Sequence, residues 1–252
     1  MADKLHKTKG IVLRSVKYGE TSLIVSIYTE VFGLQSYLIN GVRATGRKNT
    51  GRAMFFQPAA ILDLVVYYNE FKQLNRINEY KWARLNENIF TDVVKNGVAL
   101  FMVELLSKCI KQPETNSDLY HFFEDAFFHL NYCNDKVLAN YPIFFAAHLS
   151  SFFGLNPQNK NNRILESENL LFDMQEGFFT EVLPNHGYYL EKNFATVLAQ
   201  ILLVRQPDEL EEIQSNAVAR YKILEGLENY YMLHIQDFTK LKTLPVLREI
   251  LR

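Results

Sequence analysis

The sequence has few cysteines and no long hydrophobic run. Only two of its 252 residues are cysteines, Cys109 and Cys133, and both lie in apolar, helix-like context, where a small buried thiol is the usual role. A disulfide-stapled secreted domain is therefore excluded, and a reduced, intracellular protein is favoured. The longest apolar stretch, residues 141–155, is too short to cross a bilayer, and residues 1–10 lack the apolar core of a secretory signal. We expect a soluble cytoplasmic protein without a membrane partner.

A net excess of charge is also missing, but the average hides an asymmetry. The formal net charge of the chain is -1. Residues 1–80 hold eleven Lys or Arg against six acids, a net charge of +5, whereas the remaining residues hold sixteen against twenty-two, a net charge of -6. The two parts of the chain therefore differ in electrostatic character, and the N-terminal part suits an acidic partner.

One segment of this basic part has no acid at all, because no Asp or Glu lies between Glu30 and Asp63. Within it, the run NGVRATGRKNTGR (residues 40–52) places four basic side chains among glycines, threonines and asparagines. Cations without a local counter-charge displace counterions from a phosphate backbone, so this composition indicates a nucleic-acid-binding loop. The four are Arg43, Arg47, Lys48 and Arg52.

Aromatic residues flank this loop. Tyr37 precedes it, and Phe55 and Phe56 follow it. Aromatic rings offer stacking faces to the bases of a single strand. The alternative is that Phe55 and Phe56 belong to a hydrophobic core and that the loop is a solvated connection.

Residues 1–80 contain five short runs rich in Val, Ile, Tyr and Phe, separated by turn residues. Runs of this kind predict β-strands, and five of them in about 80 residues fit a small closed barrel. The runs are GIVLRSV (10–16), TSLIVSIYT (21–29), LQSYLIN (34–40), AAILDLVVYY (59–68) and FKQLNRINEY (71–80).

After residue 80, apolar residues recur at three- and four-residue spacing, which predicts helices. A polar, turn-rich stretch, residues 155–190, breaks this pattern and predicts an irregular or hairpin-like excursion. The fold class is therefore α+β, with a barrel domain over residues 1–80 and a helical-bundle domain over residues 81–252. The expected helices are 86–110, 113–133, 141–154, 193–204 and 216–235.

A phosphate-binding loop of the Walker type is not supported. Gly41 and Gly46 have its spacing, but Arg47 and Lys48 stand where it needs Lys and then Ser or Thr. An apolar strand is expected to follow, in place of the helix whose N-terminus faces the phosphates. Nucleotide hydrolysis is therefore disfavoured.

Other catalytic groups are equally sparse. His121, Asp125 and His129 share one helical face at four-residue spacing, a possible metal site, but they also fit the solvated face of an amphipathic helix. Neither Cys109 nor Cys133 has a histidine and carboxylate arrangement that would activate a thiol. The sequence does not specify an enzyme, and we expect a protein without catalytic residues.

At the level of motifs, the run YGETSLIVSIYTEVFGLQSYLINGVR (residues 18–43) resembles the N-terminal barrel of the bacterial RecO family of recombination mediators. The resemblance continues in FFGLNPQ (152–158) and LKTLPVLREIL (241–251), so it covers nearly the whole chain in the same order. The positions that carry the first run are Gly19, Glu20, Thr29, Gly33, Gly41 and Arg43.

This resemblance implies an N-terminal OB-fold, a C-terminal helical domain and a role in DNA repair and homologous recombination. Family members bind single- and double-stranded DNA and anneal complementary strands in the cytoplasm, at the nucleoid. With RecR they help to load RecA onto strands coated by single-stranded DNA-binding protein, whose acidic, apolar C-terminal tail docks on the helical domain. No cofactor is implied.

On this reading the basic loop contacts DNA phosphates, and further bases on neighbouring strands add to it. The tail of the partner needs an apolar groove rimmed by a base. The expected DNA-binding residues are Arg43, Arg47, Lys48, Arg52, Arg14, Lys17, Lys72, Arg76 and Tyr37. The possible groove residues are Lys108, Lys111, Lys240, Lys242 and Arg248.

The chain departs from the family at one point. Many members carry a four-cysteine zinc site after the Gly-Leu that matches Gly154 and Leu155, but residues 155–190 contain no cysteine here. We expect no metal there and an excursion held by apolar side chains instead. These are Leu170, Leu171, Phe172, Phe178 and Phe179.

Two other function classes stay open. An OB-fold that only docks a partner protein would have no DNA affinity of its own. A nuclease would need paired carboxylates around a metal ion, and the acids of this sequence are scattered without such a motif.

Overall fold

The computed structural model describes residues 4–43, 51–110, 112–158 and 167–251. Contacts divide the chain into two compact units. The barrel unit comprises Met1–Glu87 and Ile110–Phe128, and the helical unit comprises Asn88–Cys109 and His129–Arg252. Within the described parts, no helix is long and apolar enough to span a membrane.

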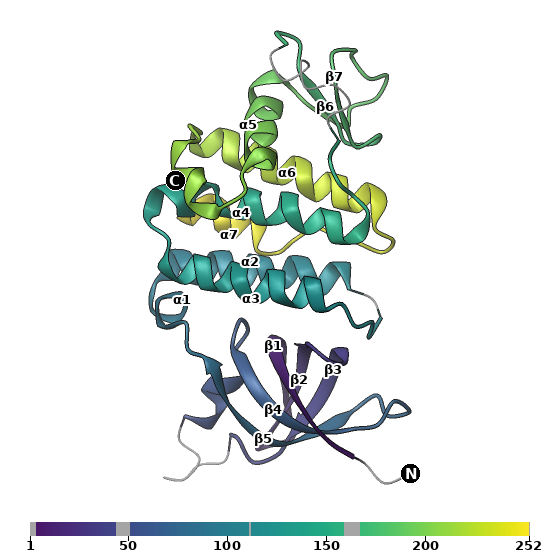
Figure 1. Ribbon diagram of the computed structural model, residues 1–252, viewed down its shortest axis with the longest axis vertical. Coiled ribbons are helices and arrows are strands. Elements are labelled where there is room, and N and C mark those ends of the chain that lie inside the picture. The colour runs from purple at the N-terminus through teal and green to yellow at the C-terminus, as the bar shows by residue number, and fades with distance from the viewer. Residues whose placement is uncertain (1–3, 44–50, 111, 159–166, 252) are drawn as a thin grey trace. The chain divides into compact units, whose positions relative to one another are not determined.

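Five strands form a closed barrel in the order β1-β2-β3-β5-β4 (Figure 1). The long first strand pairs with β4 through its first half and with β2 through its second half. A short parallel pairing of β3 with β5 closes the barrel, which confirms the predicted five-stranded barrel. The strands are β1 (Lys4–Tyr18), β2 (Ser22–Thr29), β3 (Gly33–Ile39), β4 (Ile61–Tyr68) and β5 (Asn75–Arg84).

Strand β5 crosses the domain boundary predicted at residue 80. Its second half stays paired with β4, where Trp82 lies opposite Leu62 and Tyr80 opposite Leu64. These inward-facing aromatic side chains complete the barrel core, so the strand cannot end before Arg84.

A short 3-10 helix, η1 (Arg52–Phe56), stands where a strand was expected to follow the basic loop. Phe56 is fully buried and its ring lies 4.7 Å from that of Tyr80, while Phe55 stacks on Trp82 at 4.8 Å. The hydroxyl of Ser15 donates a hydrogen bond to the Phe56 carbonyl. The two phenylalanines therefore belong to the barrel core, as the alternative interpretation had it.

The chain returns to the barrel through residues 110–128, which include the first part of α3 (Ser117–Tyr132). Lys9 Nζ lies 3.0 Å from Glu124 Oε1, and the Tyr28 hydroxyl donates to the Asn116 carbonyl at 3.2 Å. Gly33 has a φ of 61°, and a Cβ there would overlap the Glu114 carbonyl oxygen. Glycine is therefore required for this close approach.

The helical unit confirms the predicted helices, with shifted ends. Helix α4 begins at Asp135, six residues before the expected start, because Asn134 caps its first turn and Pro142 lies inside it. The Asp92 carboxylate caps Val94 and Lys95 and so separates α1 from α2. The other elements are α1 (Glu87–Thr91), α2 (Val93–Cys109), α4 (Asp135–Leu149), α5 (Lys192–Leu203), α6 (Ala217–His234) and α7 (Leu244–Ile250), with 3-10 helices η2 (Ser150–Phe153) and η4 (Pro207–Glu212).

The expected excursion contains a small antiparallel sheet in the order β7-β6-β8 (Figure 1). Its strands are β6 (Leu171–Asp173), β7 (Phe178–Thr180) and β8 (Tyr189–Leu190). Phe172 and Phe179 are buried with their rings 5.0 Å apart, and Tyr230 of α6 lies 5.6 Å from Phe172. Of the apolar residues expected to hold the excursion, Leu170 is also buried, and Leu171 and Phe178 are half-buried.

Candidate nucleic-acid interface

The outer face of the barrel across β1, β2, β3 and β5 carries two of the predicted DNA-binding residues. Side chains of directly paired residues point to the same face of a sheet. One row runs Val16, Ile24, Leu38 and Arg76, and every member is exposed or half-buried. At about 4.8 Å between strands, this row crosses roughly 14 Å.

A second row lies beside the first and runs Arg14, Ser26 and Ser36. Arg14 is exposed, and the two serines are half-buried. Together the two rows put a guanidinium at each side of a strip of serine, isoleucine and leucine side chains. None of the described residues in the two rows is acidic.

Arg43 lies at one end of this face, against the turn that joins β1 to β2. Its backbone N–H donates to the Thr21 carbonyl at 2.9 Å, and its guanidinium Nη1 donates to the Gly19 carbonyl at 3.3 Å. Gly19 has a φ of 56°, which a glycine adopts without strain. The chain that follows β3 therefore passes the β1–β2 turn at Arg43, and Arg52, at the start of η1, is exposed.

Four predicted residues lie elsewhere or outside the described parts of the chain. Lys17 is exposed but shares the row of the buried Leu23 and Ile39, so it belongs to the end of the barrel and not to the outer face. Arg47 and Lys48 lie outside the described residues. Lys72 lies in the β4–β5 turn, at the end of the barrel away from Arg43.

The prediction that Tyr37 offers a stacking face is wrong. Its side chain is 0% exposed, since it points into the barrel from the row of Val25 and Asn75. Burial, with Tyr68 as a smaller cause, raises the pKa of its hydroxyl. Tyr18, at the end of β1, is exposed, at 54%.

A pocket of about 560 Å³ on the outer face of β1, β4 and β5 is charge-balanced instead of basic. Its lysines are matched by acids: Lys9 pairs with Glu124, and Lys81 Nζ lies 3.5 Å from Asp63 Oδ2. A phosphate backbone gains little from cations that are already neutralised. The charged residues that line the pocket are Lys7, Lys9, Lys81, Glu30, Asp63 and Glu79.

Two family models match the chain in succession. The model described as "Recombination protein O N terminal" matches residues 1–86, and "Recombination protein O C terminal" matches residues 91–245. The chain therefore belongs to the RecO family. The barrel is accordingly an OB-fold followed by a helical C-terminal domain, as expected from the sequence.

Curated relatives agree over almost the full length. Proteins named "DNA repair protein RecO" from Phocaeicola vulgatus and from Bacteroides fragilis strain YCH46 are 31% and 33% identical to this chain. Each alignment covers 98% of the chain and 99% of the relative. The relative of the same name from Flavobacterium psychrophilum is 30% identical over 97% of the chain and 98% of that protein. The chain is thus a DNA repair protein of the RecO family.

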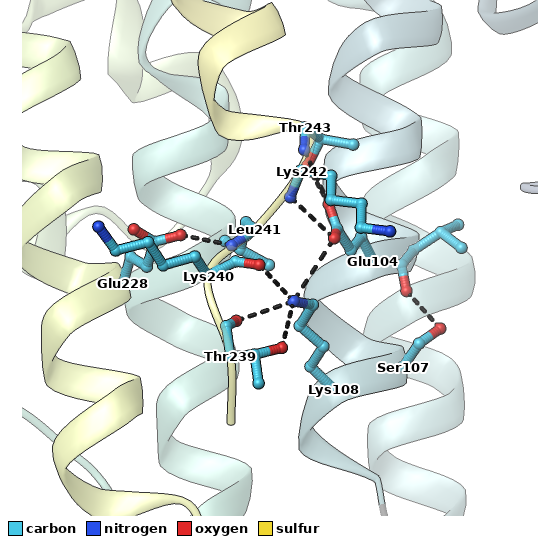
Figure 2. Close-up of polar contacts among 10 residues, drawn as sticks. Glu104, Ser107, Lys108, Glu228, Thr239, Lys240, Leu241, Lys242 and Thr243 are labelled. Carbon is cyan, nitrogen blue, oxygen red and sulfur yellow. Dashed lines mark hydrogen bonds and ion pairs between the residues drawn. The ribbon is translucent and has the colours of Figure 1, made fainter. Parts of the chain in front are cut away.

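Lys108, a predicted groove residue of this RecO-family chain, is not available as an exposed rim. Its ammonium donates to the Thr239 carbonyl and hydroxyl, both at 2.8 Å, and to the Lys240 carbonyl (Figure 2). It also lies 3.6 Å from Glu104, one turn away on α2. All three ammonium hydrogens therefore have acceptors within the chain.

Glu104 binds the next part of the same segment. Its carboxylate accepts hydrogen bonds from the backbone N–H groups of Lys242 and Thr243, both at 2.9 Å, and from the Thr243 hydroxyl at 2.7 Å (Figure 2). Burial alone would raise the pKa of Glu104, but these hydrogen bonds and the charge of Lys108 outweigh it and lower the pKa. Glu104 therefore holds the segment that leads into α7 (Leu244–Ile250), whose N-cap position is Thr243.

Arg248 is the predicted groove residue with apolar neighbours. Its guanidinium carbon lies 4.8 Å from the centre of the Tyr221 ring, and it lines a narrow hollow between α6 and α7 together with Arg220. Lys240 and Lys242 are exposed, and Lys111 lies outside the described residues. The apolar members of the hollow are Ala217, Leu224, Leu247 and Leu251.

The groups considered for catalysis do not assemble. Within the described ranges, no three His, Cys, Asp or Glu side chains lie close enough to hold a metal ion. His121 instead lies 3.6 Å from Glu30 and 3.8 Å from Glu124. Burial raises the pKa of Cys133 to about 11, despite the opposing charge of Lys95, so its thiol stays protonated at neutral pH.

The apolar strip between Arg14 and Arg76 was missed in the sequence. In the sequence, Val16, Ile24 and Leu38 cannot be distinguished from core positions, because the residues that alternate with them are also apolar. Only the register, which aligns three strands, shows that they share the outer face.

Proposed function

We propose that this chain is a recombination mediator that binds DNA through the outer face of its OB-fold and its basic loop. It anneals complementary strands and, with RecR, helps to load RecA onto DNA coated by single-stranded DNA-binding protein. The proposal assigns it to the cytoplasm and needs no cofactor and no covalent step.

The alignment of Arg14 and Arg76 on one acid-free face is the observation that carries this proposal. Neither guanidinium has a hydrogen bond or ion pair with another described residue, so both are available to phosphates. The faces of strands 2 and 3 and the adjoining loops are where OB-folds bind oligonucleotides. The apolar strip between the arginines suits the sugars and bases of a single strand, which would have little contact with a purely charged surface.

Annealing follows from electrostatics on this surface. Two strands repel each other through their phosphates, and cations that neutralise one strand lower this repulsion. Phosphate contacts carry no sequence information, so pairing proceeds for any complementary strands. The basic loop, with Arg43 at the β1–β2 turn and Arg52 on η1, extends the cationic surface beyond the sheet.

Recruitment to coated strands is assigned to the helical unit. The surface of α6 and α7 presents apolar side chains with Arg248 beside them, and this combination suits an acidic, apolar tail, whereas Arg220 donates within the chain. Lys108 is excluded from this role because its ammonium is bound within the chain. We assign the tail of the single-stranded DNA-binding protein to this surface.

Fluorescence anisotropy of a labelled single strand at several salt concentrations tests the DNA-binding part. In a variant with Arg43, Arg47, Lys48 and Arg52 changed to Ala, the slope of log affinity against log salt should be shallower by about three, at about 0.7 per lost phosphate contact. The matched control removes four exposed bases of the helical unit and should keep the parent slope. These are Lys136, Lys192, Arg205 and Lys222.

The alternative function is a protein-docking OB-fold without DNA affinity. The charge-balanced pocket on β1, β4 and β5 is the observation that favours it, because mixed charges are common at protein interfaces. If the parent protein shows no salt-dependent binding to single or double strands, this alternative replaces the proposal.

A further inference from the structure

Phe71 is the most exposed large apolar side chain in the described parts of the chain. It lies in the turn between β4 and β5, and 82% of it is exposed. Its ring has no aromatic partner among the described residues. An exposed phenylalanine of this kind is a surface that gains from contact with a partner.

The turn that presents Phe71 is held rigidly. The Asn69 side-chain oxygen accepts from the Phe71 N–H at 3.0 Å, and the Asn69 carbonyl accepts from the Lys72 N–H at 3.1 Å. The Asn69 N–H in turn donates to Asn75 Oδ1 at 3.3 Å, and the buried amide of Asn75 donates to Gln35 Oε1 at 3.2 Å. This relay ties the turn to β3 and sets the backbone position of Phe71 within the fold.

The neighbours of Phe71 are those of a nucleic-acid surface. The turn leads directly into β5, where Asn75 pairs with Tyr37 and Arg76 with Leu38, so it joins the row that crosses the outer face. Lys72 follows Phe71 in the turn, and Glu70 is the acid beside it. A basic side chain beside an exposed aromatic ring is a combination that single-strand-binding surfaces use.

We propose that Phe71 stacks on a base of a single strand bound to the outer face. This inference rests on the proposed DNA binding and adds a residue to it at the end of the face opposite Arg43. A ring on a fixed turn can stack on any base, because every base has a π-face, so it adds affinity without sequence preference. In a duplex the bases already stack on one another, and Phe71 has no base to contact. Phe71 therefore makes the surface favour single strands.

The variants Phe71→Ala and Phe71→Tyr test this inference in the full-length protein, with labelled single-stranded and double-stranded oligonucleotides as probes. Phe71→Ala should weaken single-strand binding about tenfold at every salt concentration, the effect of one lost stacking contact. Its salt slope should equal that of the parent, because no phosphate contact is removed. Phe71→Tyr should restore the affinity, and neither change should alter duplex binding.

Lys72→Ala is the matched control on the same turn. It should make the salt slope shallower by about 0.7, the reverse of the Phe71→Ala signature. If the parent binds single strands and Phe71→Ala binds them equally well, the stacking role is wrong and the proposed function stands. A parent protein that binds no DNA at any salt concentration would instead overturn the proposed function. Equal losses of single-strand and duplex binding in Phe71→Ala would show that the turn itself is disturbed, and would also refute the stacking role.

Discussion

The barrel unit and the helical unit use their basic side chains in different ways. On the outer face of the barrel, Arg14 and Arg76 are exposed and have no hydrogen-bonding partner among the described residues. In the helical unit, Lys95 and Lys108 bind backbone carbonyl groups of the same chain. The same charge is therefore left exposed in one unit and is bound to backbone carbonyls in the other.

The role of a basic side chain in these two units therefore depends on its burial and on its hydrogen-bond acceptors, not on the net charge of the unit. Lys95 is 8% exposed and has no carboxylate partner among the described residues, yet its two carbonyl acceptors stabilise it in the interior. Arg220 similarly donates to the carbonyls of Ser215 and Leu251. In the barrel the paired positions around Arg14 are serines, which leave the guanidinium exposed to solvent.

The largest effect should come from Lys95. Its Nζ donates to the carbonyls of Asn131 and Cys133, both at 2.9 Å, at the C-terminal end of α3. Changing Lys95 to Met keeps the side-chain volume but leaves both carbonyls without these charged donors. We expect the free energy of unfolding to fall by about 3 kcal/mol, measured by urea unfolding followed by far-UV circular dichroism.

The control for this variant is Lys136→Met. Lys136 is exposed, and its Nζ pairs with Glu211 at 2.8 Å, a surface ion pair. Its unfolding midpoint should match that of the parent. If the unfolding midpoint of Lys95→Met also matches that of the parent, water replaces the lost donors. The distinction between internal and exposed basic side chains would then be wrong for the helical unit.

A smaller effect is expected for Lys108, which holds the segment before α7 from the side of α2. Lys108→Met should lower the free energy of unfolding by about 2 kcal/mol, less than Lys95→Met, because part of the lost hydrogen bonding is regained from solvent. Lys240→Met is the paired measurement, since Lys240 is exposed in the same segment. It should change stability by less than about 0.5 kcal/mol. Similar losses in both variants would contradict the structural role given to Lys108.

The sequence predicts much of the barrel but not the faces of its strands. In LQSYLIN, apolar residues occupy both faces, so the alternation does not show which side is buried. The polar Gln35 points inward because Asn75 satisfies it there, and this forces Tyr37 inward as well. The inward position of Gln35, and with it the face of Tyr37, is satisfied by a hydrogen bond from Asn75, 40 positions after Gln35, which no local pattern contains.

The helical unit shows the same limit at the ends of its helices. The three- and four-residue spacing locates the long helices, since it reflects which side packs inward. Helix α7 was not expected, because the segment that leads into it is held by Glu104, a residue 139 positions before Thr243. Lys108 was placed at an exposed rim for the same reason, because its acceptors lie 131 and 132 positions away.

The smallest effect on stability, and the most specific effect on function, should come from Arg14 and Arg76. Changing both to Ala should alter the free energy of unfolding by no more than about 0.5 kcal/mol, since neither side chain holds the barrel together. The slope of log affinity for a single strand against log salt should become shallower by about 1.4, at about 0.7 for each contact. Fluorescence anisotropy and urea unfolding of the same preparations measure the two quantities.

The double variant Lys7→Ala/Lys81→Ala tests whether the position of a basic side chain on the barrel matters, or only the net charge of the barrel. It removes two positive charges from the same strands, β1 and β5, but from the charge-balanced pocket. Because acids already offset these lysines, their loss should leave the salt slope unchanged. Equal slopes in the two double variants would mean that DNA responds to the net charge of the barrel and not to the acid-free face, and the contrast between exposed and internal bases would no longer explain where DNA binds.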